Sequence, residues 1–475
     1  MAEELTPDIC VIGGGPGGIA AALAATAEGA PVVLVERGTA GGANLAYGSI
    51  PSKSLIAAAS IYDALRAGPA FGVTGAPLQV NLGKVRDHIE AVQAAISPRV
   101  SAERLTALGV KVIAGKAWFT DRRTVAGGDY VIRARRFVLA VGAIPAIPQI
   151  PGLDTVEYTT VADAFDLSRK PAHLLVLGAG RHALELAQAH NRLGIDATVV
   201  DEAPALPDDD PELAAIVVDR LRAEGVRVRA GVKILSVARR RGGIRFTVAD
   251  PAEGETAVDG SHLLVAAGRS PDVEGLGLAA AGIAHDKTGI VVDRRLRTTN
   301  RRVYAVGDAV AGPSLVARAE FQAARVVKSI LFRRPQADDP RAVPSVTFTD
   351  PALASVGLSE SEARARYKDV RTPRFPFVDN DLAEIEHVPA GMIKVVAASG
   401  GRILGAAIVG RDAGELIALW SLAIANRLPL SAMAALVAPY PTRSEIGRRV
   451  AADLPDAGLT PPLRRRIIEL LRRLG

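Results

Sequence analysis

The segment Asp8-Ile9-Cys10-Val11-Ile12-Gly13-Gly14-Gly15-Pro16-Gly17-Gly18 decides the fold of the first part of this chain. A short apolar run leads directly into glycines with the pattern Gly-x-Gly-x-x-Gly, and a helix-like run follows to Glu28. A second apolar run at 32–35 ends in Glu36. Strand, glycine loop, helix, strand and acid in this order are typical of a dinucleotide-binding unit, and the complete pattern is hard to explain as a chance glycine loop.

Each glycine of this loop has a predicted task. Gly13 permits the tight turn, Gly15 lets a diphosphate approach the backbone, and Gly18 lets the helix pack against the strand. The diphosphate is expected at the helix N-terminus, where free N–H groups and the helix dipole favour anions. Glu36 is expected to accept hydrogen bonds from the hydroxyls of the adenosine ribose.

A second motif of the same kind begins at residue 174. An apolar run leads into Gly178-Ala179-Gly180-Arg181-His182-Ala183, a helix is predicted through His190, and the strand 197–200 ends in Asp201. Alanine is tolerated at the last motif position. Asp201 suits a ribose 2′-hydroxyl and would repel a 2′-phosphate. The second site is therefore predicted to prefer NAD over NADP.

Composition places the chain among ordinary globular proteins. Its 475 residues are too many for one core and suggest two to four domains. The net charge of +6 comes from scattered basic residues with few aromatics, which gives no nucleic-acid footprint. The single cysteine, Cys10, lies in an apolar run and is predicted to be a buried hydrophobe. Neither a signal peptide nor a membrane-spanning run is recognisable, and a cytoplasmic protein without a metal site is expected.

The segment from Gly41 to Lys53 resembles a motif of a known enzyme family. It resembles the redox-disulfide segment Gly-Gly-x-Cys-x-x-x-x-Cys-Ile/Val-Pro-Ser-Lys of the pyridine nucleotide–disulfide oxidoreductases, which include lipoamide dehydrogenase, glutathione reductase and mercuric reductase. The cysteine positions are occupied by Asn44 and Ser49, and neither side chain can form a disulfide or a thiolate. The rest of the frame is present at Gly41, Gly42, Leu45, Gly48, Ile50, Pro51, Ser52 and Lys53.

The resemblance continues over residues 8 to about 452. Residues 137–142 look like the family's Ala-Thr-Gly strand, 263–272 like its Gly-Arg-x-Pro-Asn segment, 303–308 like its second flavin motif, and 346–360 like the opening of its dimerisation domain. By resemblance the first site binds FAD, and Asp308 binds its ribitol. The cofactor-binding residues implied by motif and resemblance are Gly13, Gly15, Gly18, Glu36, Gly142, Gly178, Gly180, Asp201, Gly268, Gly307 and Asp308.

The resemblance also implies the fold. An α/β protein is expected, with two Rossmann-like dinucleotide-binding domains, a C-terminal α+β dimerisation domain and a homodimeric assembly. The predicted boundaries are 1–152 and 281–342 for the two segments of the FAD-binding domain, 153–280 for the NAD-binding domain, 343–454 for the dimerisation domain and 455–475 for a basic tail. Within the first segment, helices are predicted at about 54–66 and, as one long element, at about 82–108.

Four positions are implied to carry catalysis. Lys53 and Glu185 match the family's ion pair near flavin N5, so hydride transfer into the flavin is expected to survive; alternatively, the pair only holds two domains together. Tyr440 replaces the histidine that the family's partner subunit supplies as acid–base, and Glu445 remains. Tyrosine is a poor base at neutral pH but can donate a hydrogen bond or a proton.

The expected substrate pocket is polar. Asn44, Ser49, Tyr440 and Glu445 would line it in place of the disulfide. Arg181 stands where the family usually has a tyrosine or an aliphatic residue that gates the nicotinamide pocket. Its guanidinium would stack over the flavin ring, contact a carboxamide or block the site.

The tail forms a separate feature. Apolar residues are predicted to share one face of a helix, and arginines cover much of the rest. Packing on the chain's own domain or on the dimer mate is favoured, and the alternative is peripheral contact with an anionic membrane. The apolar residues are Leu463, Ile467, Leu470, Leu471 and Leu474, and the arginines are Arg464, Arg465, Arg466, Arg472 and Arg473.

Three functions compete. The first is an FAD-dependent oxidoreductase that passes a hydride from NADH to FAD and then directly to a small acceptor such as a quinone, a dye or oxygen. The second is a pyridine nucleotide transhydrogenase, favoured by Tyr440 but opposed by Asp201. The third is a catalytically silent FAD-binding scaffold, motivated by Arg181 and the lost thiols. Mercuric reduction is disfavoured, because soft metals require thiolates.

Overall fold

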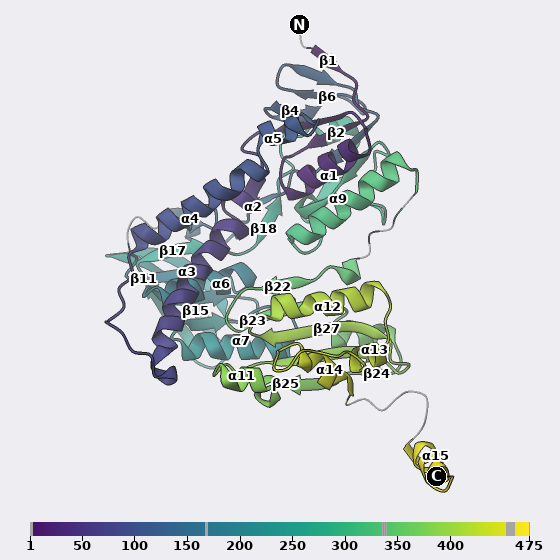
Figure 1. The fold of residues 1–475 in the computed structure, drawn as a ribbon. Coiled ribbons are helices and arrows are strands. Elements are labelled where there is room, and N and C mark those ends of the chain that lie inside the picture. Colours follow the sequence, from purple (N-terminus) through teal and green to yellow (C-terminus); the bar gives the residue numbers. More distant parts are fainter. Residues whose placement is uncertain are drawn as a thin grey trace. The chain divides into compact units, whose positions relative to one another are not determined.

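The computed structural model describes residues 3–166, 170–334, 336, 338, 340–452 and 461–474. They form two compact units, each described here by itself. The nucleotide unit comprises residues 1–204 and 224–339, and the C-terminal unit comprises residues 205–223 and 340–475. Figure 1 shows the elements of both units along the chain.

The first sheet of the nucleotide unit is parallel throughout and contains the first glycine motif. Alternate residues of its central strands enter two different cores: Cys10 and Ile12 face one, and Ile9 and Val11 face the other. A parallel sheet covered on both faces requires such continuous apolar strands. Its order is β21 (Val303–Ala305), β8 (Arg136–Leu139), β2 (Ile9–Ile12), β3 (Val32–Glu36) and β4 (Lys111–Ala114).

Different layers cover the two faces of this sheet. Helices α1 (Pro16–Ala27) and α9 (Val316–Leu331) lie side by side on one face (Figure 1). A small sheet covers the other face and contributes Phe119, Val125 and Ile132 to the core. Its order is β1 (Glu3–Leu5), β7 (Tyr130–Ile132), β6 (Val125–Gly127) and β5 (Ala117–Phe119).

The second sheet repeats this design around the second glycine motif. Helix α6 (Arg181–Arg192) connects β11 to β12, as α1 connects β2 to β3. An antiparallel sheet, β14 (Lys233–Arg240), β15 (Gly243–Asp250) and β16 (Gly254–Gly260), shares a core with it. The parallel order is β10 (Thr159–Thr160), β17 (His262–Val265), β11 (His173–Leu177), β12 (Asp196–Asp201) and β13 (Arg227–Ala230).

Two helix predictions in the first segment are wrong in their bounds. The expected helix at 54–66 begins earlier, as α3 (Ser49–Ala67), and Pro51 lies in its first turn, where a missing N–H costs nothing. The expected helix at 82–108 is divided into α4 (Leu82–Ile96) and α5 (Ala102–Ala107). Pro98 lies in the turn between them, and Ser101 caps α5 by accepting from Arg104 N at 3.2 Å.

The C-terminal unit is built on an antiparallel sheet. Trp420 of α12 (Ala413–Ala425) is buried in its core, which α13 (Leu430–Ala434) and α14 (Glu445–Ala452) complete. Shorter helices are α10 (Glu360–Arg366) and α11 (Asp381–Ile385). The sheet order is β22 (Ser345–Thr347), β23 (Ala352–Gly357), β27 (Ile403–Gly410), β26 (Met392–Ala398) and β24 (Val370–Arg371), and β25 (Arg374–Pro376) also pairs with β26.

Helix α7 (Pro211–Ala223) departs from the predicted domain boundaries. It lies within the predicted 153–280 domain in sequence, yet it packs on β23 and β27 and belongs to the C-terminal unit. Its buried face explains this placement, because Leu213, Val217 and Leu221 need an apolar partner surface.

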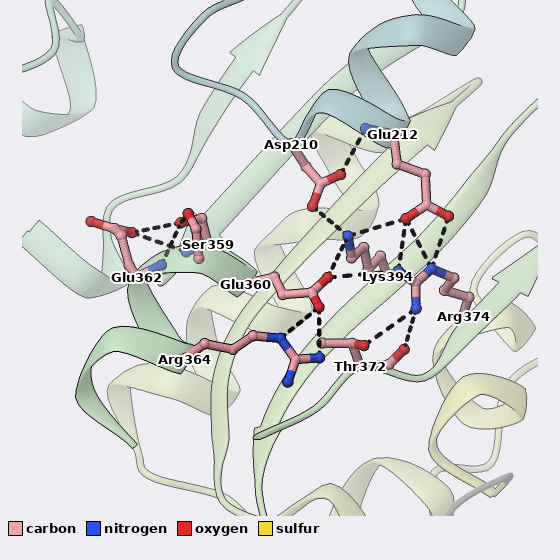
Figure 2. Close-up of polar contacts among 10 residues, drawn as sticks. Asp210, Glu212, Ser359, Glu360, Glu362, Arg364, Thr372, Arg374 and Lys394 are labelled. Atoms are coloured by element: carbon pink, nitrogen blue, oxygen red, sulfur yellow. Dashed lines mark hydrogen bonds and ion pairs between the residues drawn. The ribbon is translucent and has the colours of Figure 1, made fainter. Parts of the chain in front are cut away.

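A buried lysine fixes the start of α7 (Figure 2). Lys394 of β26 has a side chain only 5% exposed, and its Nζ lies 2.7 Å from Asp210 Oδ2, 3.1 Å from Glu212 Oε2 and 2.8 Å from Glu360 Oε2. Arg374 adds a bond of 2.8 Å from Nη2 to Glu212 Oε2. We call these five residues the Lys394 cluster. It joins α7, α10 and two strands, and the Lys394–Asp210 pair at its centre is largely removed from water.

Helix α15 (Pro461–Arg472) represents the predicted basic tail. Leu470, Leu471 and Leu474 are exposed in the single chain. The side chains of Leu463 and Arg464 lie outside the described residues, as does the preceding segment 453–460. Packing of this helix on its own domain or on the dimer mate, and the alternative of membrane contact, stay predictions. None of the described helices combines the length and the apolar character needed to cross a bilayer.

Candidate flavin and nicotinamide sites

The first glycine loop has the shape that a bound diphosphate requires. Gly13 has φ +104°, and a Cβ on it would lie 2.4 Å from the carbonyl oxygen of Ala140. A Cβ on Gly18 would lie 1.8 Å from the carbonyl oxygen of Gly13, so helix and strand touch there. A Cβ on Gly15 would meet nothing within 4 Å. Gly15 also begins α1 without a side-chain cap, so the helix N–H groups face open space.

The second loop repeats this geometry closely. Gly178 has φ +116°, and its Cβ would lie 2.4 Å from the carbonyl oxygen of Ala266. The two helix-starting glycines adopt the same conformation, with φ −75° and ψ −178° at Gly15 and φ −76° and ψ −179° at Gly180. Around Gly180 there is again open space and no side-chain cap. Both loops therefore fit a dinucleotide diphosphate.

In each motif one acidic residue ends the second strand and accepts hydrogen bonds from backbone N–H groups of the glycine loop and of the strand end. Both carboxylate oxygens of Glu36 accept from backbone N–H groups, one from Gly14 and the other from Gly38 at 2.6 Å. Asp201 accepts from Ala179 N at 2.6 Å and from Ala203 N at 3.0 Å. These contacts hold each acid at the edge of its glycine loop, where a ribose would lie.

The segment that replaces the redox disulfide packs directly on the first loop. Gly41 N donates to Gly14 O at 2.8 Å, and a Cβ on Gly42 would lie 2.9 Å from Gly15 Cα. The spacing of this frame thus has a steric cause that does not depend on thiols. Asn44 lies in α2 (Gly42–Ala46), and Ser49 begins α3.

Asn44 supplies a further test of whether a cofactor fits. Its Oδ1 is buried and has no hydrogen-bond partner among the described residues. A buried amide oxygen without a partner is costly, so a donor from a bound group is the natural completion. Together with the open glycine loops, this atom makes the first site compatible with FAD.

An ion pair joins the two halves of the nucleotide unit. Lys53 Nζ of α3 lies 2.6 Å from Glu185 Oε2 of α6, and the Glu185 side chain is only 2% exposed. Burial lowers the pKa of the neighbouring His182, a shift opposed by Glu185 and strengthened by Lys53, Arg269 and Arg181. His182 is therefore neutral at pH 7. It follows Arg181 in the first turn of α6, and the sequence prediction gave it no role.

The second flavin motif also lies in the nucleotide unit. Gly307 N donates to Gln322 Oε1 at 2.8 Å, and the Asp308 carboxylate accepts from Ser314. Arg269 Nη1 lies 3.6 Å from Asp308 Oδ2, a contact that the sequence prediction missed. The remaining two predicted cofactor glycines, Gly142 and Gly268, both have positive φ and open space beside them.

Tyr440 and Glu445 lie in the C-terminal unit with different partners. Tyr440 is 70% exposed, and its hydroxyl donates to Asp381 Oδ2 at 2.7 Å. That hydrogen bond raises the pKa of Tyr440 above its ordinary value, which keeps the phenol protonated at neutral pH. Glu445 is buried, and its Oε2 has no hydrogen-bond partner among the described residues. Asp381, rather than Glu445, orients the tyrosine within one chain, and the sequence offered no signal for this.

The single thiol of the chain is buried. Cys10 is fully buried in β2, and burial raises the pKa of its thiol to about 12. A thiol of this kind is inert at neutral pH. Among the described residues, no three histidine, cysteine or carboxylate side chains gather in a way that would hold a metal ion.

Glycine variants should separate folding from cofactor binding. Gly18→Ala is expected to weaken FAD retention by about tenfold or more and to lower the melting temperature, because overpacking costs about 1–3 kcal/mol. Gly15→Ala is expected to weaken FAD retention while the apoprotein melts unchanged, since its methyl meets only open space. Flavin absorbance after gel filtration and melting curves measure both effects.

A surface glycine provides the control for these variants. Gly75→Ala also adds a methyl group in open space, but in an exposed loop without a glycine motif. It should leave FAD retention and melting unchanged. Full FAD retention in Gly15→Ala would contradict the placement of the diphosphate.

Two glycine loops that fit dinucleotides are linked by a lysine–glutamate pair, and a C-terminal sheet domain follows. This arrangement is the one expected of a flavin- and pyridine-nucleotide-dependent oxidoreductase. The comparisons with known proteins agree. The family model "Pyridine nucleotide-disulphide oxidoreductase" matches residues 7–323, and the model of that family's dimerisation domain matches residues 343–451. The chain therefore belongs to the pyridine nucleotide-disulphide oxidoreductase family, and the C-terminal match supports a homodimer.

Individual relatives cover almost the whole chain. Mercuric reductase from Staphylococcus aureus is 32% identical over 94% of this chain and 82% of its own length. Dihydrolipoyl dehydrogenase from Geobacillus stearothermophilus is 32% identical over 93% of this chain and 94% of its own. The crystal structure of LpdA from Mycobacterium tuberculosis superimposes with a TM-score of 0.85 at 28% identity, covering 94% and 99% of the two chains. The predicted fold class, with two Rossmann-like domains and a dimerisation domain, is confirmed.

Proposed function

We propose that this protein is an NADH-dependent FAD oxidoreductase that works without a redox disulfide and delivers electrons directly to a small acceptor such as a quinone, a dye or oxygen. The observation that carries the proposal is the combination of a formed Lys53–Glu185 pair with Asn44 and Ser49 at the two thiol positions. Bound FAD would supply the two-electron chemistry, taking a hydride equivalent from the nicotinamide and releasing it to the acceptor.

The chain's own residues would divide the work between two sites. Glu185, nearly excluded from water, holds the Lys53 ammonium in a fixed position where the nicotinamide and flavin are expected to meet. Asn44 and Ser49 present neutral polar groups where the family has sulfur. Tyr440 keeps its proton and is suited to donate a hydrogen bond to an acceptor rather than to act as a base.

The nucleotide preference follows from Asp201. Its carboxylate is fixed by two backbone N–H groups at the edge of the second loop. A ribose 2′-hydroxyl can donate to it, whereas a 2′-phosphate would bring a second negative charge close by. We therefore propose NAD(H) as the preferred nucleotide, and this also weakens the transhydrogenase alternative, which needs a site for NADP.

An anaerobic titration of the FAD-loaded protein tests the proposal. The visible flavin band is expected to bleach fully at about one equivalent of NADH per FAD, because the flavin is then the single two-electron centre. NADPH should bleach it far more slowly. Two equivalents would reveal a second redox centre and contradict the proposal. A Cys10→Ala variant is the matched control, since removing the only thiol should leave the stoichiometry unchanged.

The same titration separates the alternatives. Equal bleaching by NADH and NADPH would favour the transhydrogenase. An unbleached flavin band despite bound FAD would favour the silent scaffold, and Arg181, at the start of α6, would then be the first residue to replace. Bleaching followed by turnover with several artificial acceptors is the result that we expect.

A further inference from the structure

A pocket lined by arginines lies in the nucleotide unit, away from both glycine loops. It is a cavity of about 280 Å³, and Arg135, Arg136, Arg295, Arg297 and Arg333 are among the residues that line it. Arg136 begins β8, whose other end leads to the glycine-loop edge of the sheet. The pocket therefore lies at the opposite end of the first sheet's strands from the first glycine loop, and the proposed electron transfer gives it no task.

The described residues balance the charges of this pocket only in part. Arg135 pairs with Asp8 at 2.8 Å, and Arg297 pairs with Asp293 at 2.9 Å. Arg136 donates to the carbonyl oxygen of Arg135, and no described carboxylate pairs with it. The guanidinium groups of Arg295 and Arg333 have no hydrogen-bond or ion-pair partner among the described residues. Among the described residues, five guanidinium groups and two paired carboxylates give an excess of three positive charges.

A purely structural role explains only part of this charge. Arg333 follows the C-terminus of α9, where a helix dipole favours cations. That dipole end carries roughly half an elementary negative charge. It offsets a small part of three guanidinium charges that share one cavity. Arginine cannot relieve the repulsion by losing its proton, because its pKa lies far above neutrality. An anionic ligand would relieve it.

We propose that this arginine pocket binds a compact polyphosphate group, either a free oligophosphate or the phosphate end of a nucleotide. Guanidinium forks match phosphate oxygens with paired hydrogen bonds, which favours phosphate over a diffuse negative surface. Tyr304 lines the same cavity and has a hydroxyl without a partner among the described residues. Typical small-molecule pockets measure about 300–1,000 Å³, so this cavity is small for a complete nucleotide. Two or three linked phosphates need less space and would fit.

Calorimetry on the FAD-loaded protein tests this proposal. Saturating NAD⁺ is present, so that the second glycine loop is occupied, and inorganic triphosphate is the probe. We expect one binding site per chain that weakens as salt is added. Arg295→Glu should lower the affinity at least about tenfold, since a hydrogen bond to a charged group contributes about 1.5–3 kcal/mol. A parallel titration with ATP distinguishes the two sources: weaker binding of ATP favours a free oligophosphate, and tighter binding favours a nucleotide.

Arg241→Glu is the matched control. It makes the same change in net charge at an exposed turn between β14 and β15, remote in sequence from every lining residue. It should leave triphosphate binding within about twofold. A second pocket variant, Arg333→Asn, guards against misfolding, because asparagine tolerates the φ of +53° at this position. Absent binding to the wild type, or equal weakening by Arg241→Glu, would overturn the proposal.

Discussion

Replacing Lys394 with methionine is expected to lower the free energy of unfolding of the C-terminal unit by about 3–5 kcal/mol, because it leaves a buried charge uncompensated. Asp210 is the carboxylate at risk: its side chain is 9% exposed, and Lys394 is its partner at 2.7 Å. Glu212 and Glu360 are more exposed and retain arginine partners, so they add less to the loss.

Tryptophan fluorescence can follow this unit selectively. Trp420 is buried in the C-terminal core, and Trp118 is exposed in the nucleotide unit. In a Trp118→Phe background, urea unfolding monitored by fluorescence therefore reports on the C-terminal unit. Asp210→Asn combined with Lys394→Met should recover part of the loss, because no lone charge then remains in the interior.

A more exposed ion pair beside the Lys394 cluster provides the control. Arg364 bonds Glu360 from a neighbouring helical turn, and its side chain is 54% exposed. Arg364→Met should cost at most about 0.5 kcal/mol, as is usual for an exposed pair four residues apart on a helix. Equal losses in Arg364→Met and Lys394→Met would contradict the role that we assign to burial.

The pH dependence of this stability has a definite sign. A hydrogen bond from Arg374 lowers the pKa of Glu212 below its ordinary value, and one from Lys394 does the same for Glu360. The two glutamates contribute to the free energy of unfolding at any pH above their pKa in the unfolded chain. This contribution is lost as the pH falls through their pKa in the folded protein. For Lys394, burial lowers the pKa, but bonds to three carboxylates outweigh it and raise the pKa above 10.5. Its contribution is lost only at more alkaline pH. In Lys394→Met, the free energy of unfolding measured in the same urea assay should therefore fall less steeply as the pH is lowered.

Glu185→Gln is expected to slow NADH-dependent bleaching of the flavin by about a hundredfold, as is typical when one electrostatic contact is removed from an active site. Glutamine keeps the shape but loses the charge that faces Lys53 at 2.6 Å. This variant is preferable to Lys53→Met, which would remove the ammonium beside a glutamate only 2% exposed, whereas Lys53 is 27% exposed and can be hydrated. Stopped-flow absorbance measures the rate.

A second ion pair on the same helix tests whether the Lys53–Glu185 pair only holds the fold together. Arg192 of α6 bonds Glu224 at 2.7 Å, and both side chains are largely buried. Glu224→Gln should lower the melting temperature without slowing flavin bleaching. The contradicting result is that both variants lower the melting temperature and neither slows flavin bleaching. The Lys53–Glu185 pair would then be structural, with no role in hydride transfer.

Local patterns explain why so much of the fold was predictable. The glycine loops were placed correctly because tight turns and close backbone approach depend on a few neighbouring residues, as Gly13 and Gly18 show. The boundaries of 54–66 and 82–108 were wrong because a proline within a first turn and one at a break look similar in sequence. The family resemblance added the pairing of Lys53 with Glu185, which local patterns do not contain.

The sequence by itself determined two dinucleotide-binding units, the loss of both redox thiols and the apolar faces of the main elements. Only the tertiary structure decided that α7 belongs with the C-terminal sheet, that Asp381 holds Tyr440, and that arginines from separate segments share one cavity. The physical reason is the distance along the sequence between the residues that interact. Turns and strand faces follow from neighbours in sequence, whereas Lys394 and Asp210, separated by 184 positions, meet only because strand register and helix packing bring them together.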